Sequence, residues 1–216
     1  GVRDPFGIRP LVLGDKNGSP VLASETCALD MIGAKYERDI GNGEIIVITE
    51  NGMESIKPFK KILERPCIFE RIYFASPDSI VGNKTVYTYR KALGEQLAIE
   101  NNLIADVVVP IPDSGVSAAI GFSQKSKIPF ELGIIRSHYV GRTFIEPSQT
   151  IRQFGVKLKH SVNRSCIENK KVILIDDSIV RGTTASKIVK MVYEAGAKEV
   201  HLGISCPPIL HPDFYG

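Results

Sequence analysis

The segment Lys171–Thr184, KVILIDDSIVRGTT, constrains the fold of this chain more than any other part of the sequence. Four consecutive apolar residues, Val172 to Ile175, predict a short strand that is buried on both faces. Two carboxylates follow at its end, and a loop of small and polar residues then leads into a helical pattern. In an open α/β sheet, ligands bind outside the carboxyl ends of the strands, so we expect a binding site at this loop.

The residue types in this loop suit a phosphorylated sugar. Backbone N–H groups at the start of a helix bind anions readily. Asp176 and Asp177 supply oxygen ligands for sugar hydroxyls or for the hydration shell of Mg²⁺. The alternative is an ordinary turn with an N-cap, in which adjacent acids after a strand are also common. We expect Thr183 to be both the N-cap of the helix and a phosphate ligand.

The full string resembles the signature of type I phosphoribosyltransferases for phosphoribosyl diphosphate (PRPP), which combines an apolar strand, two acids and a short Thr/Gly loop. The chain contains no Walker loop and no complete Rossmann fingerprint. The resemblance implies that Asp176 and Asp177 bind the ribose hydroxyls and Mg²⁺. The residues that it places around the 5′-phosphate are Ser178, Arg181, Gly182, Thr183 and Thr184.

Composition is that of an ordinary globular protein. Of the 216 residues, 43% are hydrophobic and 24% are charged, and a net charge of +3 gives no reason to expect nucleic-acid or membrane binding. The four cysteines are scattered without a C-x-x-C pair, which argues against a zinc ribbon and favours a reducing compartment. We therefore expect a cytoplasmic protein without nucleic-acid or membrane partners.

The pattern of apolar residues predicts two domains. Residues 1–60 are β-rich, and the basic segment 57–66 interrupts that pattern at an expected domain junction. From Cys67 onward, starting with the apolar and aromatic CIFERIYFA, strands alternate with helices. Residues 61–216 are therefore expected to form a doubly wound, mostly parallel α/β sheet.

Two further segments lie close to the acidic loop in this scheme. Another buried strand is followed by Asp113, Ser114 and Gly115. These residues form either an ordinary turn or a loop that binds diphosphate and Mg²⁺, as in type I phosphoribosyltransferases. In the second case, we expect Ser114 to contact the metal ion. The basic segment Ile135–His160 is either solvated surface or a lid. We expect residues 136–154 to close over the substrate and exclude water. The lid residues assigned to catalysis are Arg136, Tyr139 and Arg142.

Five motifs together resemble the amidophosphoribosyltransferase family along the whole chain: residues 3–14, 23–30, 73–79, 139–145 and 176–184. The resemblance implies the first committed step of purine synthesis. Glutamine is hydrolysed in an N-terminal Ntn-type domain, and its ammonia displaces diphosphate from PRPP to give 5-phosphoribosylamine. It also implies a homodimer or homotetramer and feedback inhibition by purine nucleotides.

Two features depart from the family pattern. The family's glutaminase nucleophile is an amino-terminal Cys, whereas this chain begins at Gly1. Residues 1–60 are therefore expected to be the last part of a glutaminase domain, and the chain to be an internal fragment. By itself, this fragment is not expected to use glutamine. Some family members hold a [4Fe-4S] cluster. Cys67 falls at one ligand position, but Asp213 occupies another and the later paired cysteines are absent from the chain.

Two alternative functions use the same acidic loop. A PRPP-binding regulatory module would bind without reacting, and a salvage phosphoribosyltransferase would transfer the sugar to a nucleobase. The modest net charge disfavours the first alternative, because such a module is expected to carry a basic DNA-binding domain. The lid motif YVGRTFI and residues 1–30 disfavour the second.

Overall fold

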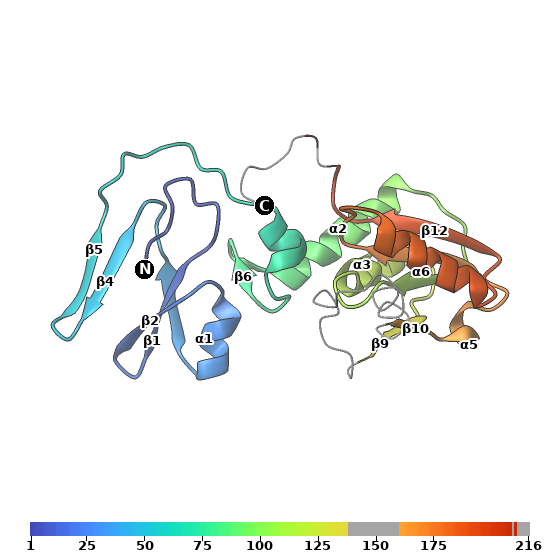
Figure 1. Cartoon of the computed structure of the whole chain (residues 1–216), viewed down its shortest axis with the longest axis horizontal. Coiled ribbons are helices and arrows are strands. Elements are labelled where there is room, and N and C mark those ends of the chain that lie inside the picture. The colour runs from blue at the N-terminus through green and yellow to red at the C-terminus, as the bar shows by residue number, and fades with distance from the viewer. Residues whose placement is uncertain (138–159, 209, 211–216) are drawn as a thin grey trace, which may run out of the picture. The chain divides into compact units, whose positions relative to one another are not determined.

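The computed structural model describes residues 1–137, 160–208 and 210, and the chain divides into two compact units, residues 1–89 and 90–216 (Figure 1). The first unit is β-rich, as the sequence predicts. Its elements in chain order are β1 (Val12–Lys16), β2 (Ser19–Ala23), α1 (Thr26–Ile32), β3 (Lys35–Asp39), β4 (Ile45–Thr49), β5 (Gly52–Ile56), η1 (Glu70–Phe74), β6 (Ile80–Val81) and β7 (Lys84–Thr85).

The first unit contains three small antiparallel sheets, of which the smallest is the two-stranded pair β6-β7. One has the order β2-β1-β3, and helix α1 packs on it through Leu29, which is 1% exposed. Another is the hairpin β4-β5, whose turn contains Asn51 and Gly52. The buried residues Leu13, Ile40 and Ile46 form a second apolar cluster of this unit, to which β1 and β4 contribute.

The second unit contains the α/β sheet that the sequence predicts. Its central strand β11 (Lys171–Asp176) pairs in parallel with β12 (Glu199–Ile204) on one side and β8 (Val107–Pro110) on the other. Its remaining elements are α2 (Val86–Glu100), which begins at the end of the first unit, α3 (Val116–Ser126), β9 (Ile134–Arg136), β10 (His160–Val162), α5 (Arg164–Ile167) and α6 (Thr183–Glu194).

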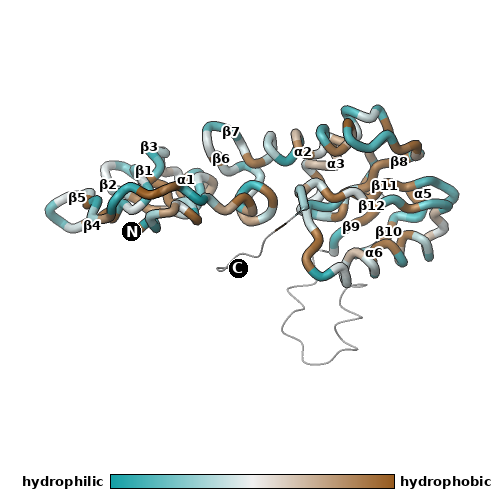
Figure 2. Tube along the Cα trace, turned by 90° about the horizontal axis from the view of Figure 1, so that it is seen from above, coloured by the Kyte–Doolittle hydropathy of each residue, from teal (hydrophilic) through white to brown (hydrophobic). Residues whose placement is uncertain are grey.

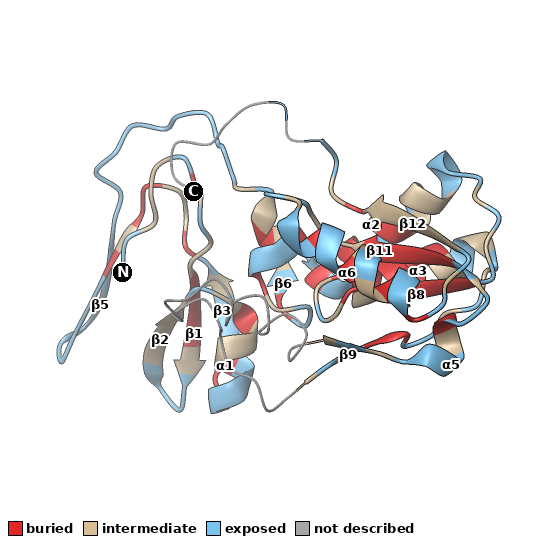
Figure 3. Cartoon of the chain, turned by 45° about the vertical axis from the view of Figure 1, so that its right-hand side comes forward, coloured by how far each residue is buried: buried red, intermediate tan, exposed pale blue. Residues whose placement is uncertain are grey.

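The central strand is buried on both faces because helices cover both faces of the sheet. Val172 and Leu174 pack with Ile188 and Val192 of α6, whereas Ile173 and Ile175 pack on the opposite face with residues of α2 and α3. Each fully buried side chain of this kind contributes about 1.5–3 kcal/mol relative to an exposed one. Figure 2 shows β8 and most of β11 as hydrophobic stretches of the tube, and Figure 3 shows them as mostly buried ribbon, whereas β12 at the edge of the sheet is intermediate.

The boundary between the compact units lies later than the predicted domain junction. Residues 57–67 contain no helix or strand, in agreement with an interruption at this point. The chain that follows nevertheless returns to the first unit: Arg65 N donates to Phe6 O (2.7 Å), and Cys67 N donates to Ile8 O (3.0 Å). Packing therefore assigns residues up to 89 to the first unit, and the domain limits of 1–60 and 61–216 stay a prediction.

One local prediction was wrong. CIFERIYFA does not begin the α/β alternation as a strand, because its residues Glu70–Phe74 form the π-helix η1. The segment ELGIIRS, residues 131–137, has a strand-like pattern and does contain the strand β9, which lies outside the parallel sheet and pairs antiparallel with β10. Aromatic content alone does not distinguish a strand from a short buried helix.

Candidate functional site

The paired acids lie at the carboxyl end of β11, where the sequence predicts a binding site. Asp176 is the last residue of the strand, and its Oδ1 accepts a hydrogen bond from the backbone N–H of Asp177 (2.9 Å). The Ser178 hydroxyl donates to Asp177 Oδ1 (3.2 Å). Asp177 is only 5% exposed, and its Oδ2 has no hydrogen-bond partner among the described residues.

Burial dominates the electrostatics of this pair. Burial, and after it the charge of the neighbouring Asp177 carboxylate, raise the pKa of Asp176 to about 7. Burial also raises the pKa of Asp177, against the hydrogen bonds from Ser178 and the charge of Arg90. A buried polar group without a hydrogen-bond partner lowers the stability of a fold by about 1–3 kcal/mol. The Asp177 oxygen therefore does not stabilise the fold, but it is available to contact a ligand.

The Asp113–Gly115 turn is held against the end of the same strand. Ile111 N donates to Ile175 O (2.9 Å), and Gly115 N donates to Ile111 O (3.0 Å). A Cβ on Gly115 would lie 2.2 Å from Ile175 O, so only glycine allows this close approach. The approach brings Ser114 within hydrogen-bonding reach of Asp176, as expected for residues of one site.

The loop after the acids ends in an open helix N-terminus. The prediction of Thr183 as the N-cap was wrong, because Thr183 is the first helical residue. The N-cap is Gly182, which has a φ of 69° and forms no side-chain cap hydrogen bond. Glycine adopts this left-handed conformation without strain, which explains the displacement of the cap by one residue. A Cβ on Gly182 would meet nothing within 4 Å. Because no side chain caps α6, its first N–H groups are available to an anion.

The predicted 5′-phosphate residues all belong to this loop and the first turn of α6. Arg181, Thr183 and Thr184 are exposed, whereas Ser178 and Gly182 are half-buried. Their exposure leaves hydroxyl, guanidinium and backbone donors free for a phosphate at the surface. The structure thus groups these residues with Asp113, Ser114 and Gly115 at one end of the β8–β11 pair.

Of the three predicted lid residues, only Arg136 lies within the described residues. It ends β9, and its Nη1 forms an ion pair with the Asp113 carboxylate. Both side chains are largely exposed, and such surface pairs contribute about 0–1 kcal/mol. Tyr139 and Arg142 lie outside the described residues, which resume at His160, opposite Arg136 in the β9–β10 register.

Two neighbours of the acids were not predicted from the sequence. The first is Arg90 of α2, which is 5% exposed and close enough to lower the pKa of Asp177 by its charge. Its signal was a charged residue on the apolar helix face that Val86, Leu93 and Leu97 define. The second is the loop after β12, where Ser205 N donates to Asp176 O (3.0 Å) and Cys206 N to Asp177 O (2.9 Å).

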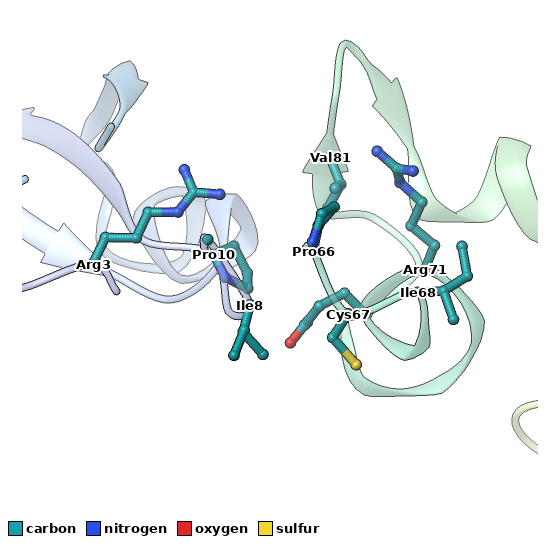
Figure 4. Close-up of a pocket in the computed structure, with 10 residues that line it drawn as sticks. Arg3, Ile8, Pro10, Pro66, Cys67, Ile68, Arg71 and Val81 are labelled. Carbon is teal, nitrogen blue, oxygen red and sulfur yellow. The ribbon is translucent and has the colours of Figure 1, made fainter. Parts of the chain in front are cut away.

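Cys67, the predicted iron–sulfur ligand position, lies in the first unit. It lines a hollow with Arg3, Ile8 and Pro10 on one wall and Pro66, Ile68, Arg71 and Val81 on the other (Figure 4). No residue predicted to bind PRPP lines this hollow. Within the described residues, no three His, Cys, Asp or Glu side chains form a group that could hold a metal ion, and Asp213 lies outside them.

The donor set at the end of β11 nevertheless fits Mg²⁺ bound together with a ligand. The side chains of Asp176, Asp177 and Ser114 offer only oxygen atoms as ligands. One of these atoms, Asp177 Oδ2, has no hydrogen-bond partner among the described residues. Mg²⁺ prefers oxygen ligands and usually keeps waters and substrate phosphates in its shell, so it does not require a cage of three protein carboxylates.

The fold and the site define a class of protein. The sequence profile of the phosphoribosyl transferase domain matches residues 91–209, more than half of the chain, and the chain belongs to this family. The matched range contains both loops at the end of the parallel sheet. No helix of the described part of the chain is long and apolar enough to cross a membrane.

Within this family, the chain is similar to amidophosphoribosyltransferases. It is 62% identical to the Rhizobium etli enzyme over 219 residues, which are 99% of this chain and 44% of that relative. It is 57% identical to the chloroplastic enzyme of Glycine max, with 100% of this chain and 38% of the relative covered. The structure of glutamine PRPP amidotransferase from B. subtilis, complexed with ADP and GMP, matches with a TM-score of 0.90 and 51% identity over 99% of this chain and 47% of that one. The chain thus spans less than half the length of these relatives.

Proposed function

We propose that the end of the β11 sheet binds PRPP. The observation that carries this proposal is the buried Asp176–Asp177 pair, with one oxygen unpartnered, beside an uncapped helix N-terminus. In this proposal the two carboxylates bind the ribose hydroxyls. The loop Ser178–Thr184 binds the 5′-phosphate through its hydroxyl and N–H donors, and the turn Asp113–Gly115 binds the diphosphate.

Asp176, Asp177 and Ser114 would also hold Mg²⁺ with its waters. When bound, Mg²⁺ neutralises negative charge on the diphosphate and makes it a better leaving group. The protein residues have the task of orientation: fixed donors place the ribose ring so that C1 faces the incoming nucleophile. The Arg136 guanidinium, which now pairs with Asp113, is placed to exchange that partner for the diphosphate.

The reaction that we propose is the displacement of diphosphate from C1 of PRPP by ammonia. The bond between C1 and the diphosphate oxygen breaks, a C1–N bond forms, and the nitrogen loses a proton to give 5-phosphoribosylamine. Electrostatic stabilisation and positioning supply most of the catalysis, because charge builds up on a leaving group that fixed donors already contact. Residues 136–154 would close over the site, but residues 138–159 lie outside those described.

The amidophosphoribosyltransferase names of relatives at 51–62% identity support this reaction as the first step of purine biosynthesis. We extend the proposal to glutamine as the ammonia source, with residues 1–60 as the last part of a glutaminase domain. The B. subtilis enzyme forms a complex with ADP and GMP, which supports purine nucleotides as inhibitors of this protein as well. A homodimer or homotetramer in the cytoplasm completes the proposal, although several plant relatives are chloroplastic.

Diphosphate release from PRPP tests the reaction directly. The full-length protein should release diphosphate when it receives PRPP, Mg²⁺ and an ammonium salt, and the Asp176→Asn/Asp177→Asn variant should not. The Lys91→Gln variant is a matched control, since Lys91 lies on α2 and pairs with Glu95 of the same helix at 4.0 Å. Absence of diphosphate release with wild-type protein would rule out the transferase, and release with a nucleobase but not with ammonia would favour a salvage enzyme.

A further inference from the structure

The loop that follows β12 lies against the backbone of both site acids. Strand β12 ends at Ile204, which is the register partner of Asp176. Beyond the strand, Ser205 N donates to Asp176 O at 3.0 Å. The next residue, Cys206, donates from its backbone N to Asp177 O at 2.9 Å. Both distances are those of well-formed hydrogen bonds, so the loop extends the contact between the two strands to the residues that carry the carboxylates.

These two hydrogen bonds hold the peptide groups on either side of the Asp177 Cα. The peptide group before this atom contains Asp176 O, and the one after it contains Asp177 O. Because each peptide group is planar, holding both of them leaves little freedom to the φ and ψ angles of Asp177. These angles fix the direction of Cβ and limit the rotamers of the side chain. The loop after β12 thus restricts where the Asp177 carboxylate points.

The strand end is also held from its other side. Ile111, which follows β8, donates from its backbone N to Ile175 O at 2.9 Å. Three consecutive carbonyl groups, those of residues 175, 176 and 177, therefore each accept a hydrogen bond from a neighbouring segment. A binding group that is held before the ligand arrives loses less conformational freedom on binding, which increases affinity.

Burial and packing keep the loop after β12 in its place. Ser205 is 9% exposed, and a Cβ on Gly203 would lie 2.8 Å from Ile175 Cδ1, so the end of β12 packs closely on β11. The chain bends at Cys206, where the thiol donates to Pro207 O at 3.1 Å. Water does not readily replace a hydrogen bond that is lost at such a buried position, so each donor of this loop should have a measurable effect.

We propose that Ser205 and Cys206 are positioning residues of the PRPP site: their backbone N–H groups hold Asp177 in the orientation that leaves Oδ2 open to ribose or Mg²⁺. This inference rests on the proposed function. Among the described residues, Oδ2 has no hydrogen-bond partner, as the proposal requires. Neither residue contacts the ligand in this proposal, and both act through the acids. The loop contributes backbone donors, so the chemistry of its side chains is secondary.

A proline substitution tests a backbone donor, because proline has no N–H group. Cys206→Pro removes the donor to Asp177 O, whereas Cys206→Ala keeps this donor and removes only the thiol. If the loop merely stabilises the sheet, Cys206→Pro should weaken PRPP binding by the same factor whether residue 177 is Asp or Asn. If the loop acts through the Asp177 carboxylate, most of the effect should disappear in Asp177→Asn. A double-mutant cycle separates these two roles.

The test is calorimetric titration of the full-length protein with Mg²⁺ and PRPP. The variants are Cys206→Pro, Cys206→Ala, Asp177→Asn and Cys206→Pro/Asp177→Asn, with Lys91→Gln as the control. We expect Cys206→Pro to weaken PRPP binding about tenfold, the effect of one unmade buried hydrogen bond, and Cys206→Ala to retain most of the affinity. In the Asp177→Asn background, Cys206→Pro should change the affinity by less than about threefold.

The outcomes distinguish the two proposals. Wild-type protein that fails to bind PRPP would overturn the proposed function, and the role of the loop with it. Wild-type binding together with equal affinities of Cys206→Pro and Cys206→Ala, or with the same loss in both Asp177 backgrounds, would overturn the role of the loop alone. If circular dichroism shows that Cys206→Pro does not fold, hydrogen exchange of the wild-type Cys206 amide takes its place. We expect slow exchange that PRPP slows further, and a rate that bound PRPP leaves unchanged would contradict the proposal.

Discussion

Two buried acids, Glu44 of the first unit and Asp177 of the second, differ in how their carboxylate oxygens are satisfied. Glu44 of the first unit is 1% exposed and fully satisfied: Arg38 donates to both its oxygens (2.7 and 3.0 Å), Ser55 Oγ donates at 2.7 Å and Gly41 N donates at 2.6 Å. The hydrogen bond from Arg38 is the main reason that the pKa of Glu44 falls to about 2. Asp177 of the second unit keeps an oxygen without a partner among the described residues, and burial raises its pKa.

We propose that the difference separates a structural acid, Glu44, from a ligand-binding acid, Asp177. Glu44 joins Arg38 of β3, the turn at Gly41 and Ser55 of β5, so its charge contributes to the packing of the first unit. Because Asp177 Oδ2 has no partner among the described residues, we expect the Asp176–Asp177 pair to destabilise the second unit in the absence of ligand. Burial alone would not distinguish these acids, whereas the number of their hydrogen bonds does.

The largest effect in this comparison should come from Glu44→Gln. Removal of the charge breaks a buried ion pair and should lower the free energy of unfolding of the first unit by about 3 kcal/mol. Hydrogen exchange of peptides from residues 35–56 measures this unit separately from the second. PRPP affinity should stay at the wild-type value. Unchanged exchange in the variant would show that Glu44 is not the structural acid that we describe.

The contribution of Glu44 should depend on pH in a defined direction. Its pKa in the folded protein is lowered from 4.5 to about 2, so the unfolded chain binds the proton first as the pH falls. The stabilisation is therefore fully present above about pH 4.5 and is lost between there and pH 2. The difference in unfolding free energy between wild type and Glu44→Gln, measured by urea titration, should shrink over this range. A difference that is constant with pH would contradict the assignment.

Asp177→Asn should have the opposite pattern to Glu44→Gln. It removes a buried charge with an unpartnered oxygen, but also a charge opposite to that of the buried Arg90, so the free energy of unfolding should fall by less than in Glu44→Gln. The affinity for PRPP should fall by about 2 kcal/mol, the usual cost of losing a hydrogen bond to a charged group. Thermal unfolding without ligand and calorimetry with PRPP measure the two quantities. A variant that loses as much stability as Glu44→Gln would remove the contrast between the acids.

Two glycines of the site should differ by a smaller amount. Gly115→Ala places a methyl group against Ile175 O and should cost about 2 kcal/mol of stability together with PRPP affinity. Gly182→Ala meets no atom within 4 Å and should cost only about 1 kcal/mol, from its left-handed backbone. Urea unfolding of both variants measures the difference. Equal losses would show that the Asp113–Gly115 turn is not packed as described.

The sequence predicts the parallel sheet and the grouping of its loops, because both follow from local patterns. Val172–Ile175 are apolar without interruption, and the acids and small residues follow directly, so their place at the strand end required no knowledge of distant contacts. The class of fold and the phosphoribosyltransferase family were predicted in this way and are confirmed. The individual roles of the site residues stay predictions.

Features that depend on contacts between distant segments were not predicted. The N-cap is Gly182 and not the predicted Thr183, because the backbone at Gly182 is left-handed. The sequence does not reveal this conformation. Arg90 is separated from Asp177 by most of the domain, and only its place on an apolar helix face indicated a partner. The return of residues 65–89 to the first unit likewise depends on backbone hydrogen bonds to residues 6 and 8.

Calorimetric titration of Mg²⁺ and PRPP into the wild-type protein and the Asp176→Asn/Asp177→Asn variant tests the central claim most directly. We predict saturable binding at one site per chain in the wild type, no measurable binding in the double variant, and wild-type binding in Glu44→Gln. Absence of binding in the wild type, or equal affinity in the wild type and the double variant, would contradict the assignment of these acids to a PRPP site.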